Sequence, residues 1–178
     1  ASIPTSGPVN EGAGEITGAD PFVPFAEGPR PDDGAAAIVS GFIRATAAGF
    51  ASDFAVAREY LTPDARAEWD PYAQVTVFDS GALTPDYDEG AGRVVYSVPV
   101  AARIDDAGRL VEAAADTQTQ LEFRVEQDSA GQWRISSLED GSLLADANFN
   151  RLFLPVSLTF ASMDGTRVVP ELRWLPQN

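Results

Sequence analysis

Two long stretches of alternating side chains constrain the fold of this chain more than any other feature. The inward-facing positions of the first stretch are Val94, Tyr96, Val98, Val100, Ala102 and Ile104. Those of the second are Thr117, Thr119, Leu121, Phe123 and Val125. A period of two places successive side chains on opposite faces of a strand, and Asp105–Gly108 is suited to a turn. The sequence therefore predicts two long antiparallel strands with one buried face.

Further strands extend this pattern. Ser129–Gly131 predicts a turn, after which Trp133 and Ile135 begin a third strand of an antiparallel meander. An earlier strand is expected from Val75 onward. Pro99 has no N–H to donate to a neighbouring strand, so it predicts a sheet edge or a bulge.

Helices are predicted before the sheet. Asp32 or Asp33 can cap a helix whose apolar stripe consists of Ile38, Val39, Phe42, Ile43, Thr46 and Phe50. A second helix is expected over 54–61. Thr62, Pro63 and Asp64 then form a cap, a first helical position and a favourable charge for a third helix. Because Asp70 precedes a proline, this helix should end near Trp69.

The last quarter of the chain has a less regular pattern. Residues 142–150 predict a short helix carrying Leu143, Leu144 and Phe149. A strand containing Val156, Leu158 and Phe160 follows. Asp164-Gly165 is a hairpin signal, and the return strand is expected to start at Val168 and to end at Pro170.

These elements predict an α+β fold in which amino-terminal helices pack on a curved antiparallel sheet. This arrangement resembles the cone-shaped fold of nuclear transport factor 2 and its relatives. We expect three regions: a flexible tether over 1–31, the α+β domain over 32–172, and the start of a linker over 173–178. Within the tether, the apolar residues 21–25 form either an extended strap along the domain or a few ordered tail residues.

Composition excludes several classes of function. The net charge of −15 opposes binding to nucleic acid or to anionic lipid headgroups. The chain has no His, Lys or Cys, which removes serine nucleophiles activated by His or Lys, cysteine nucleophiles and Cys/His zinc sites. No apolar run is long enough to span a bilayer. Among metals, the absence of Cys and His leaves only those with oxygen ligands, such as calcium or magnesium. We expect no metal and no cofactor.

Carboxylates remain as candidate functional groups. Asp86–Gly90 has the acidic density of a calcium loop but not the spacing of an EF-hand, so it is interpreted as a solvated acidic loop. A cone-shaped fold can also hold a buried Asp beside tyrosines, and the candidates for such a site are Tyr60, Asp70, Tyr72 and Tyr96. The glycine-containing segments 12–14 and 88–92 lack the context of a phosphate loop.

Several segments together resemble one family. They are the tail Ala1–Pro8, the helix around Gly41-Phe42, the block Tyr60–Pro71 and the closing Arg173–Pro176. This set is similar to the amino-terminal domain of the actinobacterial LpqB lipoprotein family. The block Tyr60–Pro71 is its most specific part.

The resemblance implies a cellular setting and a role. A lipid-modified cysteine would precede residue 1, and a GerMN-type domain and a β-propeller would follow, placing this soluble fragment at the outer face of the cytoplasmic membrane. The implied function is that of a non-catalytic accessory to the sensor kinase of the MtrA–MtrB two-component system. Its partners would be an MtrB-like extracellular domain and the protein's own downstream domains. The alternative is a small-molecule binder or carboxylate-dependent enzyme that uses the cone pocket.

Overall fold

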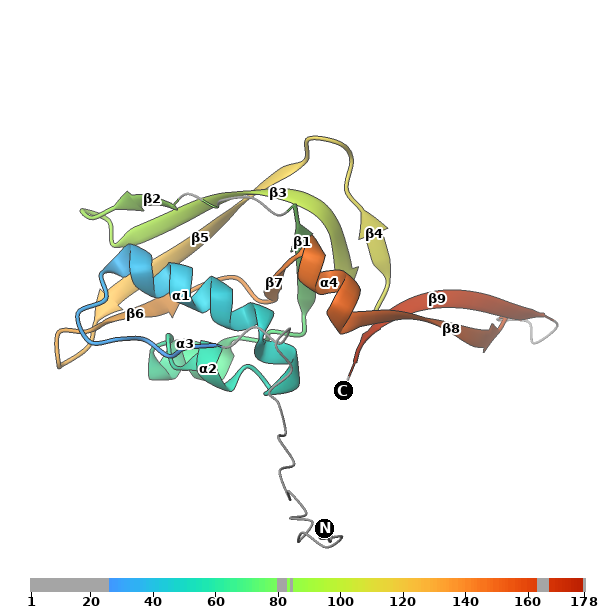
Figure 1. Cartoon of the computed structure of the whole chain (residues 1–178), viewed down its shortest axis with the longest axis horizontal. Coiled ribbons are helices and arrows are strands. Elements are labelled where there is room, and N and C mark those ends of the chain that lie inside the picture. The colour runs from blue at the N-terminus through green and yellow to red at the C-terminus, as the bar shows by residue number, and fades with distance from the viewer. Residues whose placement is uncertain (1–25, 80–82, 84, 163–166, 178) are drawn as a thin grey trace, which may run out of the picture.

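A computed structural model describes residues 26–79, 83, 85–162 and 167–177. The helical elements are α1 (Ala35–Ala47), the 3-10 helix η1 (Gly49–Ala51), α2 (Ala55–Arg58), α3 (Pro63–Glu68) and α4 (Asp146–Leu152). The strands are β1 (Gln74–Phe78), β2 (Pro85–Asp88), β3 (Arg93–Asp105), β4 (Leu110–Glu112), β5 (Gln118–Gln127), β6 (Trp133–Ser137), β7 (Ser142–Ala145), β8 (Phe153–Ala161) and β9 (Val168–Pro176). This arrangement confirms the predicted α+β class (Figure 1).

A single curled sheet is organised around the long strand β3. Its strand order is β6-β5-β3-β1-β7, and β2 and β4 also pair with β3. The pairs are antiparallel except for β1 with β7, which is parallel, so the sheet is mixed rather than a pure meander. The register between β1 and β3 shifts where Phe78 pairs with Val100, next to Pro99. The predicted irregularity at Pro99 is therefore confirmed.

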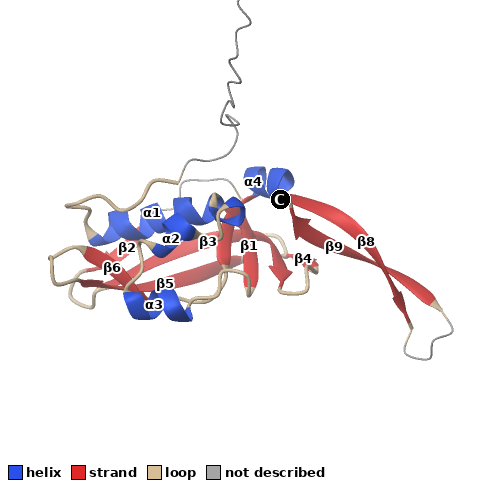
Figure 2. Cartoon of the chain, turned by 90° about the horizontal axis from the view of Figure 1, so that it is seen from below, coloured by secondary structure: helices blue, strands red, loops and turns tan. Residues whose placement is uncertain are grey.

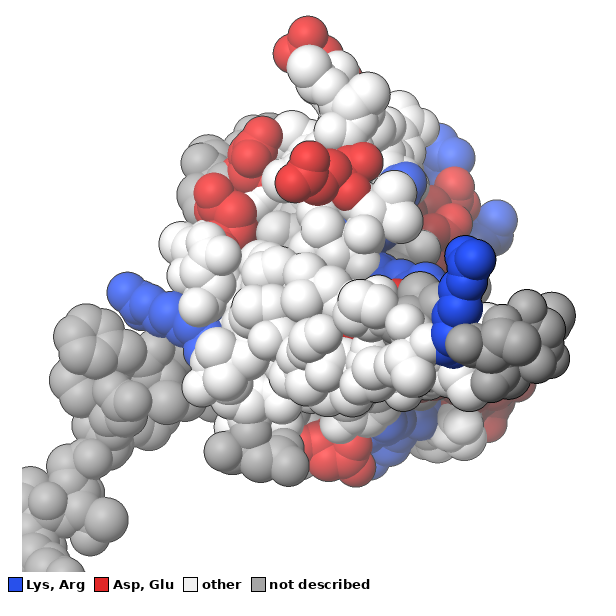
Figure 3. All heavy atoms as spheres, turned by 90° about the vertical axis from the view of Figure 1, so that its right-hand side faces the viewer, with Lys and Arg blue, Asp and Glu red and all other residues white. Residues whose placement is uncertain are grey.

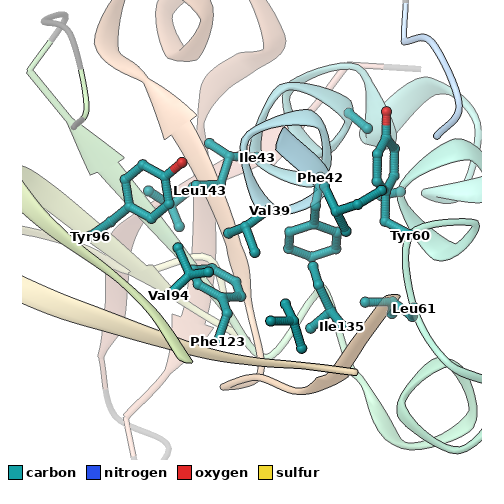
Figure 4. Packing of buried hydrophobic residues seen from close by; sticks show 14 of the residues in the cluster. Val39, Phe42, Ile43, Tyr60, Leu61, Val94, Tyr96, Phe123, Ile135 and Leu143 are labelled. Atoms are coloured by element: carbon teal, nitrogen blue, oxygen red, sulfur yellow. The ribbon is translucent and has the colours of Figure 1, made fainter. Parts of the chain in front are cut away.

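The first core cluster lies between α1 and the curled sheet. Helix α1 contacts β2, β3, β5, β6 and β7, and it also packs against α2 (Figures 1 and 2). Its stripe residues Ile38, Val39 and Phe42 are buried against strand residues such as Val94 and Ile135. The ring centroid of Phe42 lies 5.1 Å from that of Trp69 and 6.0 Å from that of Phe123, and both contacts are edge-on. Aromatic and aliphatic side chains thus fill this space (Figure 4).

A second cluster connects the sheet to the carboxyl-terminal elements. It consists of Val75, Val77, Ala102, Ile104, Leu144, Phe149 and Phe153. Strands β8 and β9 form a separate two-stranded antiparallel sheet. Its register is continuous from the pair of Phe153 with Pro176 to the pair of Ala161 with Val168. This hairpin projects away from the remainder of the molecule (Figures 1 and 2). We call residues 26–152 the body and residues 153–176 the hairpin.

The block around α3 follows the prediction closely. The side chain of Thr62 accepts a hydrogen bond from the backbone N–H of Ala65 at 3.3 Å, Pro63 is the first helical residue, and Trp69 is the C-cap. Backbone hydrogen bonds from Thr62 to Ile135 and from Ile135 to Tyr60 attach this block to β6. The predicted helix boundary therefore also fixes the position of α3 against the sheet.

Other helix boundaries differ from the prediction. The N-cap of α1 is Gly34 and makes no side-chain hydrogen bond, so neither Asp32 nor Asp33 caps this helix. Phe50 lies in η1, beyond the end of α1. The second helix spans only Ala55–Arg58; it starts at Ala55 because Phe54, its N-cap, has a left-handed backbone with φ of 56°.

Several strand predictions were incomplete or wrong. The expected helix over 142–150 begins instead as β7, because Leu143 and Leu144 pair with β1, and only the later part forms α4. Asp86–Asp88 belong to β2 rather than to a loop. Strand β9 continues past Pro170 to Pro176, so Arg173–Pro176 are strand residues. The strap at 21–25, the segment 12–14 and the turn at 164–165 lie outside the described residues.

Candidate functional site

The four residues proposed for a carboxylate site do not converge. Tyr96 and Tyr60 lie far apart in the row of core side chains, with Val39 and Phe42 between them (Figure 4). The Tyr60 hydroxyl donates a hydrogen bond to the backbone oxygen of Glu27 at 2.6 Å. Burial raises the pKa of Tyr60 and of Tyr96, which keeps both phenols neutral. They act as core residues with a satisfied hydroxyl, and the predicted cluster is wrong.

The remaining two candidates lie near the surface. Tyr72 is 45% exposed, and its hydroxyl donates to the Oδ1 of Asp53 at 2.9 Å. Asp70 is exposed and accepts a hydrogen bond from the backbone N–H of Tyr72. Its backbone also joins Asp140 and Gly141 of the β6–β7 loop. Asp70 therefore shapes a turn and is not a desolvated carboxylate.

The acidic segment Asp86–Gly90 does not form a binding site either. Asp86 and Asp88 are exposed on β2, and Asp88 accepts a hydrogen bond from the N–H of Ala91 in the following turn. Among the described residues, no group of three or more acidic side chains is arranged to hold a metal ion. No helix in the described part of the chain is long and apolar enough to cross a membrane.

Two of the surface hollows on the body are lined by charged side chains of both signs. One, of about 350 Å³, lies between residues 27–33 and α1 and is lined by Glu27, Arg30, Asp33, Arg44 and Tyr60, among others. Its charges oppose one another, and Arg30 is paired with Glu27. The other, of about 450 Å³, lies beside β3 and β4 and includes Arg103, Asp105, Arg109 and Glu112. Both hollows mix acidic and basic side chains, so neither presents a field of one sign to a charged ligand.

The hairpin carries most of the large apolar side chains that are exposed among the described residues. Eight large apolar side chains are exposed among the described residues, and six of them belong to the hairpin: Leu154, Leu158, Phe160, Val168, Leu172 and Leu175. Figure 3 shows the end of the molecule from which the hairpin projects, and neither acidic nor basic side chains cover its central part. An exposed apolar surface of this kind is typical of an interaction site.

Charged residues hold the base of the hairpin against the β3–β4 turn. Arg173 is 5% exposed; its guanidinium contacts Glu171 at 2.7 Å and donates to the backbone oxygen of Ala107 at 3.2 Å. Glu171 also accepts from Arg109 at 3.1 Å. The Trp174 N–H donates to the oxygen of Gly108 at 2.8 Å. The hairpin therefore leaves the body from a fixed base.

Gly108 permits this close approach. Its φ is +79°, and a Cβ at this position would lie 3.0 Å from the backbone oxygen of Trp174. Only glycine adopts such a conformation without steric cost. The predicted turn at Asp105–Gly108 is thus confirmed, and it also serves as the seat of the hairpin.

Fold and surface together define an α+β domain with a filled interior and a projecting apolar hairpin. Its sequence identifies the family. The family model described as "Lipoprotein LpqB, N-terminal domain" matches residues 28–150, and the chain belongs to this family. The hairpin lies beyond the matched residues.

Curated relatives carry the same name. The proteins named Lipoprotein LpqB from Cutibacterium acnes and Thermobifida fusca are 33% and 31% identical to the chain, and each alignment covers 99% of this chain and 29% of the relative. The Bifidobacterium longum protein of that name is 33% identical over 84% of this chain and 27% of its own. The chain thus spans less than a third of these relatives. No solved structure matches it, so the likeness to nuclear transport factor 2 stays a prediction.

Sequence reasoning did not identify the hairpin as the candidate surface. The pattern was nevertheless present, because Leu154, Val156, Leu158 and Phe160 alternate with positions that are themselves partly apolar, such as Phe153 and Pro155. A strand with apolar residues on both faces indicates cover on both faces. The strand predicted from Val156, Leu158 and Phe160 accounts for only one of these two faces.

Proposed function

We propose that this domain is a non-catalytic interaction module of a lipid-anchored protein at the outer face of the cytoplasmic membrane. In this proposal it serves as an accessory to a two-component sensor histidine kinase and contacts the kinase's extracellular domain. Membership of a lipoprotein family supports the anchored setting. The kinase partnership follows from the family resemblance and is open to a direct test.

The filled interior is the observation that carries the non-catalytic part of the proposal. The alternative of a carboxylate-dependent enzyme requires a deep pocket with a buried Asp or Glu facing tyrosine. Phe42, Phe123 and Ile135 occupy that space, and Asp70 is on the surface. The geometry therefore favours binding through the outer surface over chemistry inside the cone.

The charge of the domain makes a prediction about its partner. With a net charge of −15, association with another acidic surface is opposed and association with a basic one is accelerated. Screening reaches about 8 Å at physiological ionic strength, so added salt weakens exposed charge contacts. A kinase contact made by this domain should therefore involve basic residues of the kinase. Its association rate should fall as the salt concentration rises.

Titration against the extracellular region of the kinase tests the proposal. The 178-residue chain and the full-length lipoprotein are titrated in parallel by calorimetry, and their association rates are measured at low and high salt. We expect both proteins to bind with affinities within about tenfold, a difference of about 1.4 kcal/mol. Binding by neither protein overturns the kinase partnership. Binding by the longer protein alone assigns the interface to another domain.

A further inference from the structure

The hairpin is an incomplete sheet. Among the described residues it pairs with no strand of the seven-stranded sheet, and β8 and β9 pair with each other over nine residue pairs. An isolated two-stranded hairpin is marginally stable in water, and independent stability needs a third strand or a covering element. Near its base the hairpin is covered by α4 through Trp174 and Phe149, whose ring centroids are 5.0 Å apart. Toward its tip no described element covers it.

We propose that the hairpin is the first part of a second sheet, completed by a strand from the chain beyond residue 178 that pairs with the outer edge of β8. This proposal rests on the inferred place of the domain within a longer lipoprotein and is independent of the kinase. It gives the open edge of β8 a specific occupant.

Apolar side chains occur on both faces of the hairpin. Directly paired residues share a face, so Ser157 with Leu172 and Ala161 with Val168 lie on one face, and Leu154 with Leu175 lies on the other. Leu172, Val168 and Leu154 are 54%, 69% and 51% exposed. A sheet with one solvated face has polar residues on that face. Two apolar faces instead indicate a sheet that is covered on both sides.

The hydrogen-bond pattern shows which N–H groups point outward. At one end of the ladder, the N–H of Ser162 donates to the backbone oxygen of Arg167. At the other end, the N–H of Gln177 donates to the backbone oxygen of Leu152. Since hydrogen-bonded pairs alternate in an antiparallel ladder, even-numbered residues of β8 point their N–H groups at β9. Odd-numbered residues of β8 and even-numbered residues of β9 point outward. The outward N–H of Trp174, which donates to Gly108, agrees with this assignment.

The outer edge of β9 is largely closed to a new strand. Pro170 and Pro176 occupy two of its outward positions and have no N–H, and the N–H of Trp174 is already paired with Gly108. Proline at an edge position is a common way to prevent strand addition. The position of Pro170 also explains why β9 does not end there, since its missing N–H would not have paired with β8.

The outer edge of β8 is open. Its outward N–H groups beyond Pro155 belong to Ser157, Thr159 and Ala161, all of them exposed residues. In the described part of the chain, no backbone acceptor is paired with these three groups. Their row of donors, flanked by apolar side chains, has the features of a site for strand addition. Because both faces of the hairpin are apolar, the strand that binds there should be apolar on both faces as well.

The longer chain of the relatives supplies the occupant. The matched family model describes an N-terminal domain and ends at residue 150, whereas this chain covers only 29% of the Cutibacterium acnes relative. Most of such a protein therefore lies outside this domain. A second copy of this chain is a weaker candidate, because each copy carries a net charge of −15. Attachment in the same chain also raises the effective concentration of the added strand.

Hydrogen exchange measured by mass spectrometry tests the proposal on the 178-residue chain and on the full-length protein. In the full-length protein we expect amide protection over 157–161 to rise at least tenfold, which corresponds to about 1.4 kcal/mol. Protection over 93–104 in β3 should be unchanged and serves as an internal reference. Equal protection of 157–161 in both proteins overturns the proposal.

Two proline variants distinguish the edges. Thr159→Pro removes an outward N–H of β8 and leaves the hydrogen bonds between β8 and β9 intact. In the 178-residue chain, the hydrogen-exchange rates of the hairpin amides should therefore change less than twofold. In the full-length protein the added protection of 157–161 should disappear. Leu172→Pro removes an outward N–H of β9 and should preserve this protection. Loss of protection in the second variant but not in the first would refute the choice of edge.

The oligomeric state of the 178-residue chain tests the other candidate occupant of the β8 edge, a second copy of this chain. Light scattering of the 178-residue chain should show a monomer. A dimer that dissociates in Thr159→Pro would assign the β8 edge to a second copy and overturn the proposal. Kinase binding is measured on its own, so failure of the second sheet and failure of the kinase partnership give different results.

Discussion

The body and the hairpin both contain paired strands but differ in where their apolar side chains lie. In the body, Val94, Val98 and Ile135 are completely buried beneath α1. In the hairpin, Leu154 and Leu172 are about half exposed. The difference shows that strand pairing and burial are separate requirements. The body meets both within the described residues, whereas the hairpin meets only the first.

A matched pair of leucine deletions should give the largest contrast between the two regions. Leu144 is completely buried, so Leu144→Ala should lower the free energy of unfolding by about 2–5 kcal/mol through lost transfer energy and a cavity. Leu172 is 54% exposed, so Leu172→Ala should change it by less than about 0.5 kcal/mol. Urea unfolding measures both. Equal costs would show that the hairpin is packed as tightly as the body.

A pair of charge-removing variants should give a smaller contrast. Glu171→Gln removes the negative charge beside the buried guanidinium of Arg173 and weakens the contact with Arg109. We expect opening of the hairpin to become easier by about 1–2 kcal/mol, because a buried charge loses its partner while Glu171 itself is partly exposed. Hydrogen exchange over 153–176 measures this change.

Glu122 provides the control for this experiment. It faces Arg93 at 3.6 Å, and both side chains are 44% exposed. Exposed ion pairs contribute about 0–1 kcal/mol, so Glu122→Gln should leave exchange in the hairpin unchanged and affect the body only slightly. A larger loss in the control than in Glu171→Gln would contradict the anchoring role of Arg173.

The sequence was most informative where the determinants are local. The cap at Thr62 involves residues within one helical turn, and the alternation of β3 and β5 is contained in each strand. The identity of β7 could not be predicted in this way. Its residues Leu143 and Leu144 form a strand because β1, about 70 residues earlier in the chain, lies beside them in parallel. A short apolar run alone does not distinguish a strand from a helix.

The candidate site was harder to predict than the fold. Tyr60 and Tyr96 were grouped because both are tyrosines in a chain with few other functional groups, but their positions depend on how α1 packs between them. Pro170 was interpreted as the end of a strand because sequence does not show whether its missing N–H faces a partner. That distinction depends on the register of the hairpin. The apolar residues on both faces of β8 are, by contrast, visible in the sequence.

A threonine pair compares a local cap in the body with an exposed position in the hairpin. Thr62→Ala removes the oxygen that accepts from the Ala65 N–H and should lower the free energy of unfolding by about 1 kcal/mol. Thr159→Ala, on the exposed edge of β8, should change it by less than about 0.5 kcal/mol. Thermal unfolding monitored by circular dichroism measures both variants. A larger effect at Thr159 would show that its side chain already has a partner in the 178-residue chain.

Alkaline pH should produce the smallest change in the free energy of unfolding. Tyrosine ionisation should affect only the body, because the body contains all four tyrosines. Burial raises the pKa of Tyr72, and its hydrogen bond to Asp53 raises it further. A phenol whose pKa is higher in the folded state contributes fully below its unfolded pKa of about 10, and this contribution is lost as pH rises through the folded value. Tyr72→Phe should therefore change stability by less than about 0.5 kcal/mol near pH 8. It should also lose slightly less stability than the unmodified chain as pH rises above about 10. Denaturant unfolding at the two pH values measures the difference, and a steeper alkaline loss in the variant would contradict the sign of this effect.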